Sequence, residues 1–139
     1  MLMPESQSIW YNELGSKMAL DADGKGGLTG TYVSAVGSAQ DEYALVGRYN
    51  PAQSPPTVGW TVQWVNSHKK TNSVTSWSGQ LMNVDGVPTI LTTWLLTQQT
   101  KPENEWESTM VDQDVFTPNK PTDEQIRLAK MKRGCSNPV

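Results

Sequence analysis

Short segments of alternating apolar and polar residues, separated by turns rich in glycine, proline and asparagine, run through most of this chain. Such alternation is typical of β-strands, because successive side chains of a strand point to opposite faces. The pattern predicts eight strands, over residues 8–14, 18–22, 28–37, 43–49, 58–65, 72–82, 89–97 and 107–116. We expect no helix between them.

Short strands joined by hairpin-length loops predict an antiparallel meander, and an up-and-down β-barrel is its expected closure. A barrel of this size encloses room for about one small ligand. A β-sandwich is the alternative. The barrel is favoured because polar side chains recur on the face expected to point inward, where a sandwich core has no use for them. The expected fold class is therefore an all-β, eight-stranded antiparallel up-and-down β-barrel with a short C-terminal helical tail.

The length of 139 residues fits one domain. We expect a disordered N-terminal segment over residues 1–7, a ligand-binding barrel over 8–118 and a tail with a short helix over 119–139.

The tail contains the signals of a helix start. Thr122 as N-cap and Gln125 three residues later form a capping box. Such a helix is marginal alone, so it either docks through Ile126 and Ala129 or frays.

Composition excludes several classes of partner. The net charge of −3, with no basic cluster outside the last ten residues, argues against nucleic acid. No apolar run is long enough to span a membrane. The N-terminus lacks the basic start and apolar stretch of a secretory signal, so a cytoplasmic protein is the simpler expectation, with secretion after removal of a signal as the alternative.

The residue inventory does not favour catalysis. His68 is the only histidine and lies in a turn with lysines, while Cys135 lies far from it near the C-terminus, so neither a catalytic triad nor a metal site is expected. Asp112 and Asp114 share a strand face and form at most a weak candidate for paired acids of a glycosidase. We expect a protein that is not an enzyme and uses neither a cofactor nor a metal.

The stretch over residues 72–82 carries the strongest functional signal. Ser73, Thr75 and Trp77 share one strand face. A buried hydroxyl without a partner costs roughly 1–3 kcal/mol, so this face is expected to meet a polar ligand. The alternative is a solvent-exposed face on which the tryptophan is a lone anchor. Similar mixed faces follow from the alternation in other strands, with Tyr32, Ser34 and Val36, with Trp60, Val62 and Trp64, and with Trp94 and Leu96.

Trp106 ends a polar loop, where a lone indole would be wasted on water. The strand at 89–97 is apolar on both faces, since Leu91 and Leu95 oppose Trp94 and Leu96. An apolar barrel exterior requires a partner, so we expect another subunit to bury Trp106.

These segments resemble the avidin and streptavidin family of biotin-binding proteins, and look closest to its tamavidin-like fungal members. The resemblance lies in seven collinear blocks, which are Trp-Tyr-Asn-Glu-Leu-Gly-Ser (10–16), Leu-Thr-Gly-Thr-Tyr-Val-Ser-Ala-Val-Gly (28–37), Gly-Arg-Tyr (47–49), Gly-Trp-Thr-Val-Gln-Trp (59–64), Ser-Val-Thr-Ser-Trp-Ser-Gly-Gln (73–80), Thr-Trp-Leu-Leu-Thr (93–97) and Trp-Glu-Ser-Thr (106–109). The tail at 121–135 also looks like the tamavidin extension. One departure is Ser8-Ile9, where the family usually carries Gly-Thr.

The resemblance implies a role for each polar residue at one end of the pocket. Asn12, Ser16 and Tyr32 would donate hydrogen bonds to the ureido oxygen of biotin. Ser34 and Asp114 would accept hydrogen bonds from its two N–H groups.

The remaining implied contacts lie along the ligand. Thr75 would face the ring sulfur, while Ser73 and the backbone N–H of Ser38 would hold the carboxylate. The resemblance further implies that the bicyclic ring and alkyl chain would be enclosed by Trp64, Trp77 and Trp94, with Leu96 and Val36 filling gaps, and that Trp106 would cap the pocket of a neighbouring subunit.

The expected function is non-catalytic capture of biotin and biotinylated molecules by a homotetramer, which is favoured because the disulfide pair of the dimeric subgroup is absent. The alternatives are a lipocalin-like carrier of another apolar molecule, and a carbohydrate-binding lectin or glycosidase.

Overall fold

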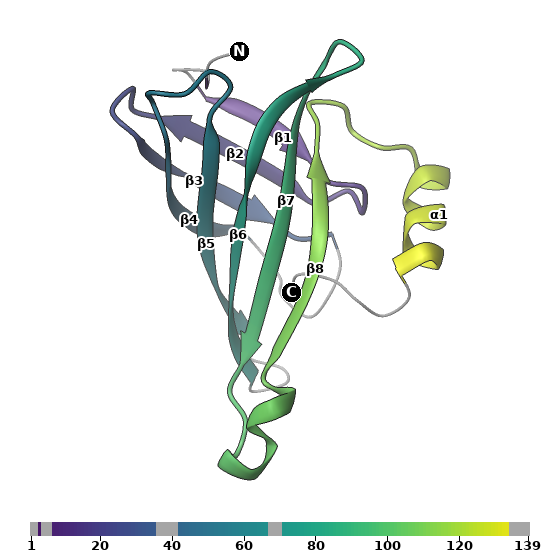
Figure 1. The fold of residues 1–139 in the computed structure, drawn as a ribbon. Coiled ribbons are helices and arrows are strands. Elements are labelled where there is room, and N and C mark those ends of the chain that lie inside the picture. Colours follow the sequence, from purple (N-terminus) through teal and green to yellow (C-terminus); the bar gives the residue numbers. More distant parts are fainter. Residues whose placement is uncertain (1–2, 4–6, 36–41, 67–70, 134–139) are drawn as a thin grey trace.

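The computed structural model describes residues 3, 7–35, 42–66 and 71–133. Its elements are β1 (Ser8–Tyr11), β2 (Lys17–Ala22), β3 (Gly27–Val33), β4 (Glu42–Tyr49), β5 (Thr57–Asn66), β6 (Thr71–Val84), β7 (Val87–Gln98), the 3₁₀ helix η1 (Pro102–Glu107), β8 (Thr109–Phe116) and α1 (Asp123–Arg133). The strands form one eight-stranded sheet in which each strand pairs with the next along the chain (Figure 1). The predicted antiparallel meander is confirmed.

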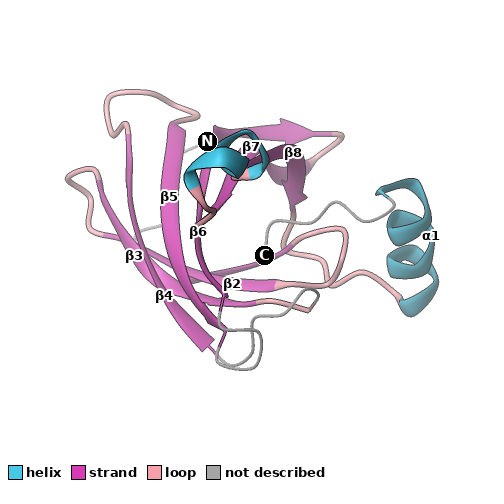
Figure 2. Cartoon of the chain, turned by 90° about the horizontal axis from the view of Figure 1, so that it is seen from below, coloured by secondary structure: helices cyan, strands magenta, loops and turns pink. Residues whose placement is uncertain are grey.

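The sheet curls on itself (Figure 2), and an isolated bridge joins its first and last strands. Tyr11 and Thr117 form an isolated antiparallel bridge with two backbone hydrogen bonds of 2.8 and 3.0 Å. Next to it, the Val115 N–H donates to Oε2 of Glu13 at 3.1 Å. We call this meeting line the seam. One residue pair and one side chain therefore join the two edges into an up-and-down barrel.

The first strand is shorter than the alternation predicted. β1 ends at Tyr11 rather than at residue 14, because Asn12 Oδ1 accepts the N–H groups of both Leu14 and Ser16 at 3.0 and 2.9 Å. A side chain that satisfies nearby backbone donors offers the chain an alternative to the strand ladder. The residues that follow β1 therefore form a tight loop, 12–16.

Two other boundaries also differ from prediction. β3 ends at Val33 rather than at residue 37, and Ala35 N–H donates to Ser16 Oγ at 3.0 Å instead of to a strand. The expectation of no helix between the strands was wrong, because η1 precedes β8 and delays its start to Thr109. Pro102 opens η1, where its fixed φ and missing N–H suit a first turn.

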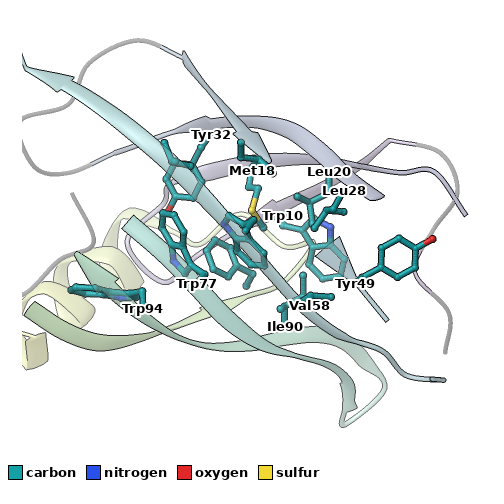
Figure 3. Packing of buried hydrophobic residues seen from close by; sticks show 14 of the residues in the cluster. Trp10, Met18, Leu20, Leu28, Tyr32, Tyr49, Val58, Trp77, Ile90 and Trp94 are labelled. Atoms are coloured by element: carbon teal, nitrogen blue, oxygen red, sulfur yellow. The ribbon is translucent and has the colours of Figure 1, made fainter. Parts of the chain in front are cut away.

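Aromatic and aliphatic side chains together fill the barrel interior (Figure 3). Trp60 stacks on Trp77 with ring centroids 5.7 Å apart and meets Phe116 edge-on at 5.5 Å. Complete burial of a large apolar side chain contributes roughly 1.5–3 kcal/mol. The other fully buried apolar side chains include Met18, Leu20, Leu28, Leu45, Leu81 and Ile90. This packed layer closes one end of the barrel beneath the predicted site.

The predicted capping box of the tail is confirmed. Thr122 N–H donates to Oε1 of Gln125 at 2.8 Å, and Gln125 N–H donates to Oγ1 of Thr122 at 3.1 Å. α1 lies on the outside of the barrel beside β8 in both views (Figures 1 and 2). Ile126 and Ala129 are its half-buried apolar residues, as the docking prediction required. Among the described residues, no helix has the length and apolarity needed to cross a membrane.

Candidate functional site

β6 forms the central wall of the barrel interior, and its register with β5 and β7 arranges the wall in layers. Ser73 pairs with Trp64, Thr75 with Val62 and Leu96, and Trp77 with Trp60 and Trp94. In the next layer Thr92 of β7 pairs with Asp114 of β8. Hydroxyls and indoles therefore follow one another down the same wall, as the alternation predicted for Ser73, Thr75 and Trp77, and the Asp114 carboxylate lies in the next layer.

The loop 12–16 holds the Asn12 side chain in one orientation. Its Oδ1 accepts two backbone N–H groups, so its Nδ2 must point the other way, toward Tyr32 Oη at 3.4 Å. Ser16 lies at the other end of the loop, and its Oγ accepts the Ala35 N–H. Asn12, Ser16 and Tyr32 are all buried. The geometry presents a buried amide donor beside a phenol, before any ligand arrives.

Asp114 lies buried next to the seam, and its Oδ2 accepts the indole N–H of Trp77 at 2.9 Å. Its backbone carbonyl oxygen accepts a hydrogen bond from the Thr92 hydroxyl at 3.0 Å. A hydrogen bond to a charged acceptor is worth roughly 1.5–3 kcal/mol, so Asp114 fixes the Trp77 ring as well as placing a carboxylate in the interior.

Aromatic rings surround these polar groups. Tyr32 packs against Trp77 (Figure 3), with ring centroids 5.1 Å apart, and against Trp64 edge-on at 5.6 Å. The Trp64 indole N–H donates to Thr75 Oγ1 at 2.8 Å. An indole N–H can only donate, so Thr75 is the acceptor in this bond. These rings and hydroxyls hold one another in fixed positions.

Two further indoles have buried N–H groups. Within the described residues, Nε1 of Trp60 and Nε1 of Trp94 have no hydrogen-bond acceptor. A buried donor left unpaired costs roughly 1–3 kcal/mol. The wall of the site therefore contains donor capacity that the described protein groups do not use.

Most of the predicted site residues face the barrel interior. Those that are buried there are Asn12, Ser16, Tyr32, Trp64, Thr75, Trp77, Trp94, Leu96 and Asp114. Ser34 and Ser73 are half-buried, the first just beyond the end of β3 and the second near the start of β6. Val36 and Ser38 lie outside the described residues. Trp106 stands apart on η1 and is 76% exposed.

Sequence reasoning missed three residues that support this arrangement. Tyr43 packs edge-on against Trp64 at 5.0 Å and its hydroxyl donates to the Val65 carbonyl, Thr92 holds the backbone beside Asp114, and Glu13 binds across the seam. The alternation of the strand puts Thr92 on the same face as Trp94 but gives it no role in the site. No local pattern could show that Glu13 reaches β8, because that contact joins residues 102 positions apart.

The outer surface of the same strands is also hollowed. A depression of about 940 Å³ is lined by residues of β4 to β8 and of the turn after β4, among them the exposed Arg48, Ser78, Gln80, Thr93, Gln113 and Val115. Leu95 and Val111 pair across β7 and β8 on this outer side and are 51% and 62% exposed. In the part of the chain that the structure describes, no group of three or more His, Cys, Asp or Glu residues is placed to hold a metal ion.

Comparison with known proteins agrees with this architecture. A match to the Avidin family covers residues 4–119. Avidin-related protein 4/5 of Gallus gallus is 33% identical over 114 residues, which span 78% of this chain and 73% of that protein.

Two further relatives are matched over smaller shares of their own length. Afifavidin of Afifella pfennigii is 34% identical over 100 residues, covering 70% of this chain and 60% of that protein. Fibropellin-1 of Strongylocentrotus purpuratus is 30% identical over 116 residues, covering 80% of this chain and 10% of that protein. The family match spans the whole barrel, including both sides of the seam. The chain belongs to the avidin family.

Proposed function

We propose that this protein binds biotin without catalysis inside the barrel formed by residues 8–118. The observation that carries the proposal is the buried Asn12 carboxamide, whose Oδ1 is held by two backbone N–H groups so that its Nδ2 points toward Tyr32. A rigid amide donor beside a phenol suits an oxygen acceptor that carries partial negative charge, as the ureido oxygen of biotin does. The Ser16 hydroxyl is the third donor to this oxygen in the proposal.

The other side of the ureido group meets acceptors in this proposal. Asp114 and Ser34 accept its N–H groups, and the Asp114 carboxylate is buried, where a hydrogen bond is stronger than in water. Trp64, Trp77 and Trp94 enclose the ring and alkyl chain, with Leu96 and Val36 filling the remaining space. Thr75 faces the sulfur, while Ser73 and the backbone of Ser38 hold the carboxylate.

The assembly that we propose is a homotetramer. Trp106 is 76% exposed, and the outer faces of β7 and β8 expose Leu95 and Val111. Monomeric proteins rarely leave a contiguous apolar patch of this kind uncovered. In the tetramer Trp106 of one subunit caps the biotin site of a neighbour. Resemblance of the sequence blocks to tamavidin-like members supports this arrangement, and biotinylated molecules are the proposed partners.

Calorimetric titration tests the function. Biotin and a biotin amide, which keeps the ureido group, are expected to bind at one molecule per chain. Octanoate and glucose serve as controls, because the first carries only an apolar chain and a carboxylate and the second only hydroxyls. Octanoate binding at the level of biotin would instead indicate a carrier of apolar molecules, and glucose binding would indicate a lectin.

A further inference from the structure

Helix α1 touches the barrel at a position that matters for the site. A Cβ placed on Gly15 would lie 2.9 Å from Cδ1 of Ile126, so the isoleucine side chain packs directly on the Gly15 backbone. Ala35, which follows β3, lies on the same spot at 3.9 Å. Gly15 has a φ of +87°, a conformation that favours glycine. Three separate segments therefore meet at one residue of the loop 12–16.

This loop carries two of the proposed donors to the ligand, and it is held both by its own hydrogen bonds and by contacts to other segments. Asn12 N–H donates to the Ser16 carbonyl at 3.0 Å, and Gly15 N–H donates to the Asn12 carbonyl at 3.1 Å. Glu13 reaches β8 through the Val115 N–H. Ile126 covers Gly15, which lies immediately before Ser16. The loop is therefore held from the inside by Asn12 and from the outside by α1.

The rest of α1 makes little other contact with the barrel. Ile126 and Ala129 are half-buried, whereas Leu128 and Met131 are 45% and 68% exposed. A groove of about 600 Å³ separates the helix from the outer side of β8, lined by Glu13, Asp112, Gln113 and Val115 on one side and by Gln125, Leu128, Ala129 and Lys132 on the other. Because this gap separates much of the helix from β8, we take the close contact of Ile126 with Gly15 as a main point of docking.

We infer that Ile126 is a positioning residue, through which α1 holds the loop 12–16 and so fixes the Asn12 carboxamide and the Ser16 hydroxyl at the ligand site. The consequence for biotin rests on the proposed function, whereas the consequence for the loop does not. A helix outside the barrel would then control the polar end of the pocket inside it.

Amide hydrogen exchange of the ligand-free protein tests the inference without any ligand. In Ile126→Ala the N–H groups of Leu14 and Ser16, which donate to Asn12, are expected to exchange about tenfold faster, because the loop opens locally more often. Met131→Ala, on the exposed side of the helix, is the matched control and should leave both rates unchanged. Amides in β6 should be unaffected in both variants. Equal exchange of Leu14 and Ser16 in Ile126→Ala and in the wild type would overturn the inference.

The contact itself is tested with glycine substitutions. Gly15→Ala introduces both backbone strain and a clash with Ile126, whereas Gly86→Ala, at a φ of +83° with no atom within 4 Å, introduces strain alone. Gly15→Ala should therefore lower the unfolding temperature more than Gly86→Ala. The excess should shrink when Ile126→Ala is also present. An excess that persists in that background would show that the helix does not press on Gly15.

Biotin dissociation then separates the two proposals. Ile126→Ala should speed dissociation about tenfold, since changes at an interface act mainly through the off-rate. A double-mutant cycle with Ser16→Ala should show coupling, and one with Ser73→Ala at the other end of the site should be additive. If the wild type bound no biotin while Leu14 and Ser16 still exchanged faster in Ile126→Ala, the proposed function would fail and the positioning role would stand. Coupling to Ser73 instead of Ser16 would overturn the positioning role.

Discussion

The inner and outer faces of β6, β7 and β8 are built from the same strands but are completed differently. On the inner face two of the indole N–H groups have partners within the chain, since Trp64 donates to Thr75 and Trp77 donates to Asp114. Those of Trp60 and Trp94 have no acceptor among the described residues. On the outer face, hydroxyl pairs such as Thr61 with Ser76 and Thr97 with Thr109 bridge neighbouring strands at 2.9 Å. Between these pairs lie exposed apolar side chains, Leu95 and Val111 among them.

This difference indicates that the proposed ligand site and the proposed subunit contact would place different requirements on the two faces of one sheet. On the inner face, hydrogen bonds hold the Trp64 and Trp77 rings in place before a ligand binds. On the outer face, the hydroxyl pairs suit contact with water, whereas the exposed Leu95 and Val111 side chains would be stabilised by burial. Substitutions on the inner face should therefore act on ligand affinity, and those on the outer face on assembly.

The largest effect is expected at the inner face. Asp114→Ala should weaken biotin binding by about 3 kcal/mol or more, roughly a hundredfold, because the ligand loses a charged acceptor and the buried Trp77 N–H loses its partner. Calorimetry by displacement of a weaker analogue measures the change. Asp21→Ala, an exposed carboxylate of β2, is the control and should bind like the wild type. Affinity within threefold of the wild type in Asp114→Ala would contradict the assigned role.

Trp106→Lys tests whether Trp106 of one subunit covers the ligand site on the inner face of a neighbouring subunit. Biotin dissociation should become about tenfold faster or more, since buried tryptophans dominate interface energies, and the assembly should shift toward dimers. Stopped-flow competition and light scattering measure the two properties on the same sample. A variant with the wild-type off-rate and size would show that the indole belongs to its own subunit.

A smaller effect on the ligand is expected from Leu95→Glu, which places a charge on the outer face of β7. The charge should disfavour burial against another subunit, so sedimentation should show smaller species. Val33→Glu, at an exposed apolar position of β3, is the matched control and should keep the wild-type size. Loss of biotin binding without any change in size would mean that the faces are not separable.

The smallest effect is expected outside both faces, in the hairpin between β2 and β3. The backbone N–H groups of Lys25 and Gly27 donate to Asp23 at 2.7 and 2.8 Å and hold the pKa of its carboxyl below the ordinary value. A carboxyl whose pKa is lowered by folding stabilises the protein at pH values above its ordinary pKa. This stabilisation is lost as the pH falls through the lowered pKa.

Asp23→Ala should therefore lower the unfolding temperature slightly at neutral pH, and the difference should disappear in strong acid. Thermal unfolding of both proteins across the acid range measures it. A difference that stayed constant with pH would rule out the carboxylate as its cause. Biotin affinity should not change at neutral pH.

Much of the fold could be predicted from sequence because its information is local. Each strand pairs with its neighbour along the chain, and alternation within a strand already separates the inward Ser73, Thr75 and Trp77 from the outward residues. The capping box of α1 is likewise set by two residues three positions apart.

The predictions from sequence were wrong where a single side chain overrides the alternation of several neighbouring residues. The alternation at residues 8–14 continues past Tyr11, but a single side-chain oxygen of Asn12 takes the next backbone donors and ends the strand. Trp77 could be placed on the inner face, yet its bond to Asp114 depends on the register of two hairpins. Contacts such as Glu13 with Val115 and Ile126 with Gly15 join opposite ends of the chain, and no periodicity encodes them.

The seam also has a consequence for the order of folding. Every strand pairing except that of Tyr11 with Thr117 joins neighbours in sequence, so the sheet can grow hairpin by hairpin while its two edges are still apart. Contacts between distant parts of a chain form late because closing a long loop is slow. Asn12 and Ser16 lie on one side of the seam and Asp114 on the other. Competence to bind a ureido ligand is therefore expected to emerge only in the last kinetic step, after the strands have formed, and bound ligand should slow the reopening of that one join.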